Sequence, residues 1–171
     1  MQNHFELFQL PLQFEIDMSA LDSAYRNVQS QVHPDKFASA SDAEKRVAMQ
    51  WATRANEAYQ TLKSPLKRAT YLCELQGVDL ETESNTSMPR NFLMQQMEWR
   101  ETLADAQAAR DIGALERLDA ELRGVRELEI AQISGLLAAR NFAAAAQAVR
   151  QLMFVEKVGS EVAQLFDLLE S

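Results

Sequence analysis

Pro34 separates two stretches of sequence in which apolar residues recur at helical spacing. The first stretch runs from a capping pattern at Ser19 and Asp22 and places four residues on one face: Leu21, Tyr25, Val28 and Val32. The second follows a capping box at Ser41 and has a predicted seam of Val47, Trp51, Ala55, Ala58 or Tyr59, and Leu62. Because proline lacks an N–H and restricts the residue before it, no helix can continue through Pro34. The sequence therefore predicts a helical hairpin that turns at this proline.

The rest of the chain also shows helical patterns, and no segment alternates apolar and polar residues long enough to predict a strand. A short helix is expected over residues 4–10, where Pro11 stops it. Another is expected from Pro65, with Ser64 as its N-cap, to about Leu75. The fold class that follows is all-α.

Residues 76–88 contain almost nothing that could be buried, and we interpret them as a linker. Beyond them, helices are predicted over residues 89–107, 111–138 and 141–169, with Pro89 at the first helical position and Asp111 and Asn141 as N-caps. Loops this short make the neighbouring helices antiparallel, which predicts a three-helix bundle. The expected organisation is a first domain over residues 1–75, the linker, and a second domain over residues 89–171.

Composition limits the compartment and the chemistry of the 171-residue chain. A hydrophobic content of 47% with 25% charged residues is ordinary for a globular protein. The single Cys73 cannot form an internal disulfide, and with only His4 and His33 beside it no metal cluster or cofactor site is expected. The sequence has neither a secretory signal nor a long apolar run, so we expect a soluble cytoplasmic protein without membrane association.

The net charge of −8 is unevenly distributed along the chain. Eight basic residues face four acidic ones between Arg26 and Leu72, whereas sixteen acidic residues face nine basic ones from Gln76 onward. Halves of opposite sign suggest two different partners, although each half could also be a set of solvated helix faces. The interleaved acids and the negative net charge argue against a nucleic-acid partner.

The turn itself reads His33-Pro34-Asp35. Pro34 stiffens the loop, so that His33 and Asp35 present a donor and a charged acceptor on a pre-organised corner. An ordinary turn with an incidental histidine would have the same three residues. An acid–base pair is a further possibility, but no Ser or Cys nucleophile pattern accompanies it, so catalysis is not expected.

The flanks of the loop resemble the J domain, the module by which co-chaperones activate the ATPase of DnaK-type chaperones. The resemblance covers residues 4–72 and rests on Tyr25-Arg26, Lys36, the run Asn56-Glu57-Ala58-Tyr59, and Pro65. It implies a helical hairpin with short flanking helices. It also implies that the chaperone binds a set of six residues: Tyr25, Arg26, His33, Pro34, Asp35 and Lys36.

The first helix of the predicted bundle has two different faces. At about 100° per residue, the expected core face carries Phe92, Trp99, Leu103 and Ala106. The opposite half carries three apolar and three acidic residues, namely Leu93, Met94, Met97, Glu98, Glu101 and Asp105. Phe154 is similarly displaced from the seam of the last helix. These residues could form a partner site, or the apolar ones could cap the bundle or pack against the first domain.

Taken together, the chain resembles the HscB family, the J-type co-chaperones of bacterial iron–sulfur cluster assembly. Three strings carry this resemblance: residues 33–38, Phe92-Leu93-Met94, and residues 150–154. It implies a non-enzymatic co-chaperone that binds the iron–sulfur scaffold protein IscU, delivers it to the chaperone HscA and stimulates the HscA ATPase. The implied scaffold-binding residues are Leu93, Met94, Met97, Glu98, Glu101, Asp105 and Phe154.

Ser30 and Val32 depart from the J-domain pattern, which often has a basic residue and an aromatic one at these positions. Steering toward the chaperone would then depend more on four other bases: Arg26, Lys36, Lys45 and Arg46. Two other functions would each require a further sequence feature. A J protein for many unfolded clients would need a broad apolar groove or Gly/Phe-rich segments, and a helical hydrolase would need a catalytic constellation, and the sequence shows neither.

Overall fold

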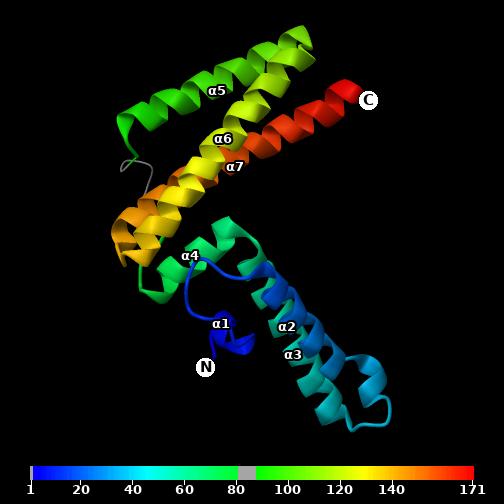
Figure 1. Cartoon of the computed structure of the whole chain (residues 1–171). Helices are drawn as coiled ribbons and strands as arrows, with labels where there is room; N and C mark the ends of the chain where they lie inside the picture. The colour runs from blue at the N-terminus through cyan, green and yellow to red at the C-terminus, as the bar shows by residue number, and fades with distance from the viewer. Residues whose placement is uncertain (1, 81–87) are drawn as a thin grey trace. The chain divides into compact units, whose positions relative to one another are not determined.

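The computed structural model describes residues 2–80 and 88–171, and the chain divides into two compact units, Met1–Leu72 and Cys73–Ser171. Every regular element in the described ranges is helical, which confirms the predicted all-α class (Figure 1). Most of the predicted linker, residues 81–87, lies outside the described residues. At its two ends Leu80 and Met88 are buried, so the expectation that this stretch has almost nothing to bury is wrong there. None of the described helices is long and apolar enough to cross a membrane.

The first unit is a helical hairpin with short flanking helices. Helix α2 (Met18–Gln31) and helix α3 (Asp42–Lys63) lie side by side and are joined at the short 3-10 helix η1 (Pro34–Phe37) (Figure 1). Helix α1 (His4–Leu7) packs against α3, and α4 (Pro65–Leu75) runs across the boundary between the units. The core of the hairpin contains side chains with no exposed surface, among them Phe5, Leu21, Ala55, Ala58 and Leu62.

Two helix starts and one helix end differ from the prediction. Asp17, not Ser19, caps α2, because its extended backbone lets the carboxylate accept the N–H groups of Ser19 and Ala20. Pro89 is the N-cap of α5 and not its first helical residue, since its ψ of 142° is still extended. Helix α1 ends at Leu7, and Gln9 with its positive φ of 56° turns the chain before Pro11 is reached.

The predicted seam of α3 is wrong in its first two positions. Val47 and Trp51 are 51% and 37% exposed, and Ala48 is buried in their place. The buried line runs through Ala48, Ala55 and Leu62 at seven-residue spacing, so one face of the helix stays against α2. The two larger side chains fall to the edge of that face.

The second unit contains the predicted three-helix bundle, built from α5 (Arg90–Ala109), α6 (Ile112–Ala138) and α7 (Phe142–Glu170). The connections are only two or three residues long, so each helix reverses the direction of the one before, and α5 and α7 run the same way (Figure 1). Asp111 and Asn141 cap α6 and α7 as predicted. The core is formed by Trp99, Leu115, Leu118, Leu122, Val155, Val158, Val162 and Leu165.

Candidate functional site

The His33-Pro34-Asp35 loop is an ordered and exposed corner of the first unit. His33 is the N-cap of η1, and its Nδ1 accepts the backbone N–H of Asp35 at 3.2 Å. The backbone N–H of Lys36 donates to the His33 carbonyl at 3.0 Å, while Pro34 occupies the first helical position. The His33 and Asp35 side chains are nevertheless 58% and 92% exposed. The loop is therefore fixed by its own backbone and free to contact a partner.

This capping bond also sets the chemistry of the imidazole. Because Nδ1 of His33 accepts a hydrogen bond, the neutral ring carries its proton on Nε2. The Asp35 carboxylate lies 3.6 Å from Nδ1 and is open to solvent. The corner thus offers one ring N–H donor and one carboxylate acceptor, on two residues that are separated by a single proline.

Tyr25 contributes to the hairpin as well as to the candidate chaperone surface. Its hydroxyl donates to Oδ1 of Asn56 on α3 and accepts from Nε2 of Gln29 at 2.9 Å. Its ring stacks on Tyr59, with centroids 4.1 Å apart, and the Tyr59 hydroxyl donates to Asp22 at 2.9 Å. The Asp22 carboxylate raises the pKa of Tyr59, because it stabilises the protonated phenol. Tyr25 therefore fixes the register of α2 on α3.

Arg26 and Lys36 complete the candidate chaperone set, and both are exposed. Lys45 and Arg46, which start the second turn of α3, are exposed as well. These four bases lie on elements that meet at the loop, so the structure keeps them available for an acidic partner surface.

Helix α5 has the two faces that its sequence predicts. Trp99 and Ala106 are buried, Leu103 packs against the core, and Phe92 meets the Trp99 ring edge-on at a centroid distance of 6.1 Å. The opposite face is exposed at all six predicted positions: Leu93, Met94, Met97, Glu98, Glu101 and Asp105. Met97 is 71% exposed, so the interpretation that these residues cap the bundle core is excluded for it.

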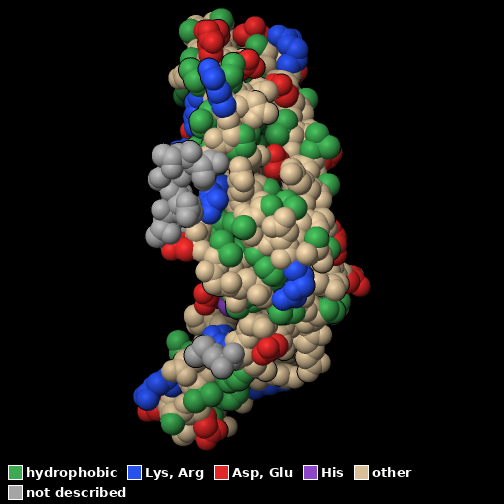
Figure 2. Space-filling model, turned by 90° about the vertical axis from the view of Figure 1, so that its left-hand side faces the viewer, with side chains coloured by type: hydrophobic (Ala, Val, Ile, Leu, Met, Phe, Trp, Pro, Cys, Tyr) green, Lys and Arg blue, Asp and Glu red, His purple; other side chains and the backbone are tan. Residues whose placement is uncertain are grey.

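Figure 2 shows hydrophobic side chains at the molecular surface, interspersed with acidic and basic ones. Single exposed apolar residues are ordinary on a globular protein. Leu93, Met94 and Met97 differ because all three lie within about one and a half turns of one helix. Their clustering beside three carboxylates is what makes the face a candidate site.

Phe154 lies on the neighbouring helix α7 and is half-buried. An ion pair between Arg100 of α5 and Glu161 of α7 fixes how these two helices are aligned. Leu93 precedes Arg100 by seven residues and Phe154 precedes Glu161 by seven, which is about two turns in each case. Since α5 and α7 run the same way, Leu93 and Phe154 lie at the same level, each on the face that carries the ion pair.

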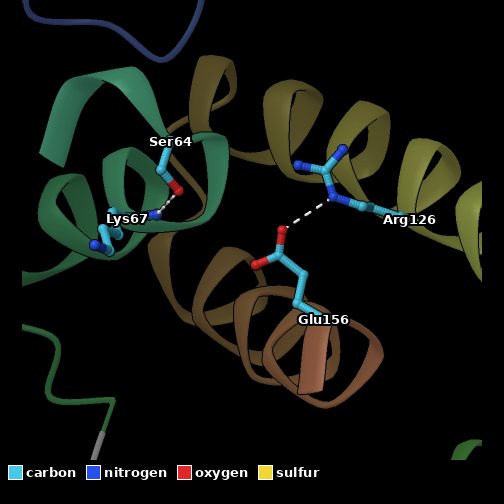
Figure 3. A network of polar contacts seen from close by, with 4 residues as sticks. All are labelled: Ser64, Lys67, Arg126 and Glu156. Carbon is cyan, nitrogen blue, oxygen red and sulfur yellow. Dashed lines mark hydrogen bonds and ion pairs between the residues drawn. The ribbon is translucent and has the colours of Figure 1, made fainter. Parts of the chain in front are cut away.

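A second ion pair, between Arg126 Nε and Glu156 Oε1 at 3.0 Å, joins α6 to α7 (Figure 3). In the first unit the Ser64 hydroxyl accepts the backbone N–H of Lys67 at 3.2 Å, which is the N-cap predicted for α4 (Figure 3). The interhelical pairs were not predicted, because charges on different helices pair only once the helix rotations are known. No three His, Cys, Asp or Glu side chains gather as metal ligands in the ranges that the structure describes.

A helical hairpin with an exposed and fixed His-Pro-Asp corner, followed by a separate three-helix bundle, defines a J-type co-chaperone. Residues 88–163 match the family described as the HSCB C-terminal oligomerisation domain. The chain is 61% identical over 168 residues to the co-chaperone protein HscB homolog of Ralstonia nicotianae, covering 98% of this chain and 96% of that one. The chain belongs to the HscB family of co-chaperones.

Solved structures of the family agree with this assignment. The chaperone HscB from Vibrio cholerae superposes with a TM-score of 0.86 at 43% identity, covering 98% of this chain and 99% of that one. The human co-chaperone protein HscB gives a TM-score of 0.91 at 26% identity, covering 96% of this chain and 82% of the human one.

Proposed function

We propose that this chain binds the iron–sulfur scaffold protein IscU through its bundle, delivers it to the DnaK-type chaperone HscA and stimulates the HscA ATPase through its loop. It would thereby assist iron–sulfur cluster assembly and transfer in the cytoplasm, without catalysing a reaction itself. In this proposal residues 1–75 form the J domain, residues 76–88 the linker and residues 89–171 the scaffold-binding domain. The main observation in support of this proposal is that each unit exposes a group of residues that do not pack in its own core.

The loop supports the chaperone half of the proposal. A partner that binds His33 and Asp35 need not order the backbone of the corner, because the capping hydrogen bond and the proline already hold that backbone in place. The exposed bases Arg26 and Lys36 would steer an acidic surface of HscA toward the same corner.

The α5 face supports the scaffold half. Leu93, Met94 and Met97 offer adaptable apolar anchors, and Phe154 lies at the level of Leu93 on α7. Glu98, Glu101 and Asp105 continue the same side of the helix, so a matching surface of the scaffold would be apolar with a basic border. This combination of anchors and acids suits one dedicated client better than many unfolded ones, which would need a broad apolar groove.

The delivery step is one of binding and not of covalent chemistry. HscA holds a client weakly in one nucleotide state and tightly in the other, so stimulating hydrolysis while the client is presented transfers it to the chaperone. The chain needs only to bind both partners at once and to favour the hydrolysing state. This requires that the loop and the α5 face be usable independently.

A titration with purified proteins tests the proposal. The full chain is titrated with IscU by calorimetry, and HscA ATP hydrolysis is then followed with the chain alone, IscU alone and both together. We expect saturable binding of IscU and a hydrolysis rate with both proteins that exceeds the rates with either one. Absence of IscU binding, or an HscA rate that the chain leaves unchanged, would contradict it.

A further inference from the structure

An apolar hollow of about 320 Å³ lies beside the loop in the first unit. It is lined by Val32, Phe37, Ala43, Glu44, Val47, Ala48 and Trp51. Six of these seven residues are hydrophobic, and the Oε1 of the seventh, Glu44, accepts a hydrogen bond from the Ser41 hydroxyl at 3.1 Å. The hollow therefore suits an aliphatic or aromatic side chain.

The local sequence explains why this space is not filled by the protein itself. Where η1 meets the start of α3, the helix presents the small side chains of Ala43 and Ala48. Val47 and Trp51 stand at the edge of the α3 seam and leave about half and a third of their surface exposed. Exposing a tryptophan and a valine side by side costs hydrophobic free energy, which a partner that covers them would recover.

The position of the hollow identifies which partner would cover it. Val32 directly precedes His33 and Phe37 directly follows Lys36, so the wall of the hollow is continuous with the loop at both ends. The guanidinium of Arg54 lies 5.1 Å from the Trp51 ring centroid and adds a cation to the rim. An acidic partner surface that binds His33 and Asp35 would therefore also contact the hollow.

We propose that this hollow receives one apolar side chain of the DnaK-type chaperone that binds the loop, so that the interface combines a polar corner with an apolar anchor. This inference rests on the proposed function. A second copy of the chain that docked through the same surface is a poorer occupant, because eight basic residues face four acidic ones in the segment from Arg26 to Leu72 and two such segments repel each other.

The test uses the full chain, purified HscA and single-turnover ATP hydrolysis over a range of chain concentrations. Val47→Lys places a charge in the hollow, and Ala43→Leu fills it with a neutral side chain that favours helix. Met49→Lys is the matched control, since Met49 is 71% exposed on α3 and does not line the hollow. Circular dichroism melts confirm that each variant is folded.

We expect both hollow variants to raise the concentration for half-maximal stimulation about tenfold or more. This change corresponds to the loss of the free energy gained by burying one aliphatic side chain. Met49→Lys should change it less than about twofold, as a surface substitution away from the contact. If both hollow variants match the wild type while His33→Gln abolishes stimulation, the proposed function stands and the hollow is not part of the interface.

Two other outcomes are also decisive. If the wild-type chain fails to stimulate HscA at all, the proposed function is wrong and this inference falls with it. If sedimentation equilibrium shows that the wild-type chain self-associates and that Val47→Lys abolishes this association, the occupant is a second copy and the inference is overturned.

Discussion

Arg100 of α5 forms an ion pair with Glu161 of α7, and this contact aligns the two helices of the bundle that run in the same direction. Seven residues earlier on each helix lie Leu93 and Phe154. The ion pair therefore shows the register of the two helices. In this register the two apolar residues proposed to bind the scaffold lie at one level, although they are 61 positions apart in the sequence. Partly exposed ion pairs contribute little to stability, so its main effect is on alignment.

Replacing both anchors by alanine tests the scaffold face. Leu93→Ala with Phe154→Ala should weaken IscU binding by about 3 kcal/mol, because interface anchors carry most of the binding free energy. The unfolding midpoint should shift little, since Leu93 is exposed and Phe154 only half-buried. Calorimetric titration measures the affinity.

Leu128→Ala is the matched control for this experiment, because Leu128 is an equally large aliphatic residue, 73% exposed, on α6. It should leave IscU affinity unchanged. If the control weakens binding as much as the double variant, the α5 face does not define the site.

The loop is tested by His33→Gln. Glutamine keeps a polar side chain but has no rigid ring to combine the Nδ1 acceptor with a fixed Nε2–H donor, so stimulation of HscA should be lost. Steady-state ATP hydrolysis measures the effect, and IscU affinity provides the internal control. Undiminished stimulation would show that the loop is an ordinary turn.

Tyr25→Phe separates the two roles of this residue. It keeps the ring stacked on Tyr59 but removes the hydroxyl that bonds Asn56 and Gln29, which should lower the free energy of unfolding by about 1 kcal/mol. Urea unfolding measures the change. Unaltered stability together with weaker binding of HscA would mean that the hydroxyl serves the partner and not the hairpin.

Cys73 gives the chain a predictable pH dependence. Burial raises the pKa of this thiol to about 11, because the thiolate would lie in an apolar environment. In the unfolded chain the thiol ionises at lower pH, so the unfolded state gains stability first and the free energy of unfolding falls as the pH rises toward 11.

Urea unfolding at several alkaline pH values, on the wild type and on Cys73→Ala, measures this contribution. The variant should lose less stability over the alkaline range than the wild type. Parallel pH profiles would show that Cys73 ionises equally in both states.

The helices and most of their caps could be predicted because the signals are local. Ser41, Asp111 and Asn141 each stand directly before an apolar periodic run, and each caps its helix. Asp17 was missed because Ser19 with Asp22 forms a competing capping pattern within the first turns of the same helix, and only the backbone angles decide between the two. The two faces of α5 followed from the spacing of its apolar residues alone.

Features that depend on how helices are rotated against each other could not be predicted. The buried face of α3 passes through Ala48, whereas Val47 and Trp51 have helical spacing to Ala55 but lie at the edge of that face. The contacts of Tyr25 with Asn56 and of Arg100 with Glu161 need the register of two helices, which no single-helix pattern contains. These tertiary contacts are what place the loop and the α5 face where partners could bind them.

The most direct test compares variants of the two surfaces in one assay. ATP hydrolysis by HscA is measured with and without IscU for the wild type, for His33→Gln and for the double variant Leu93→Ala, Phe154→Ala. We expect His33→Gln to bind IscU normally but never to stimulate HscA. We expect the double variant to stimulate HscA alone as the wild type does but to lose the added effect of IscU. If each variant instead loses both activities, the loop and the bundle do not form two separate binding surfaces, and the account is contradicted.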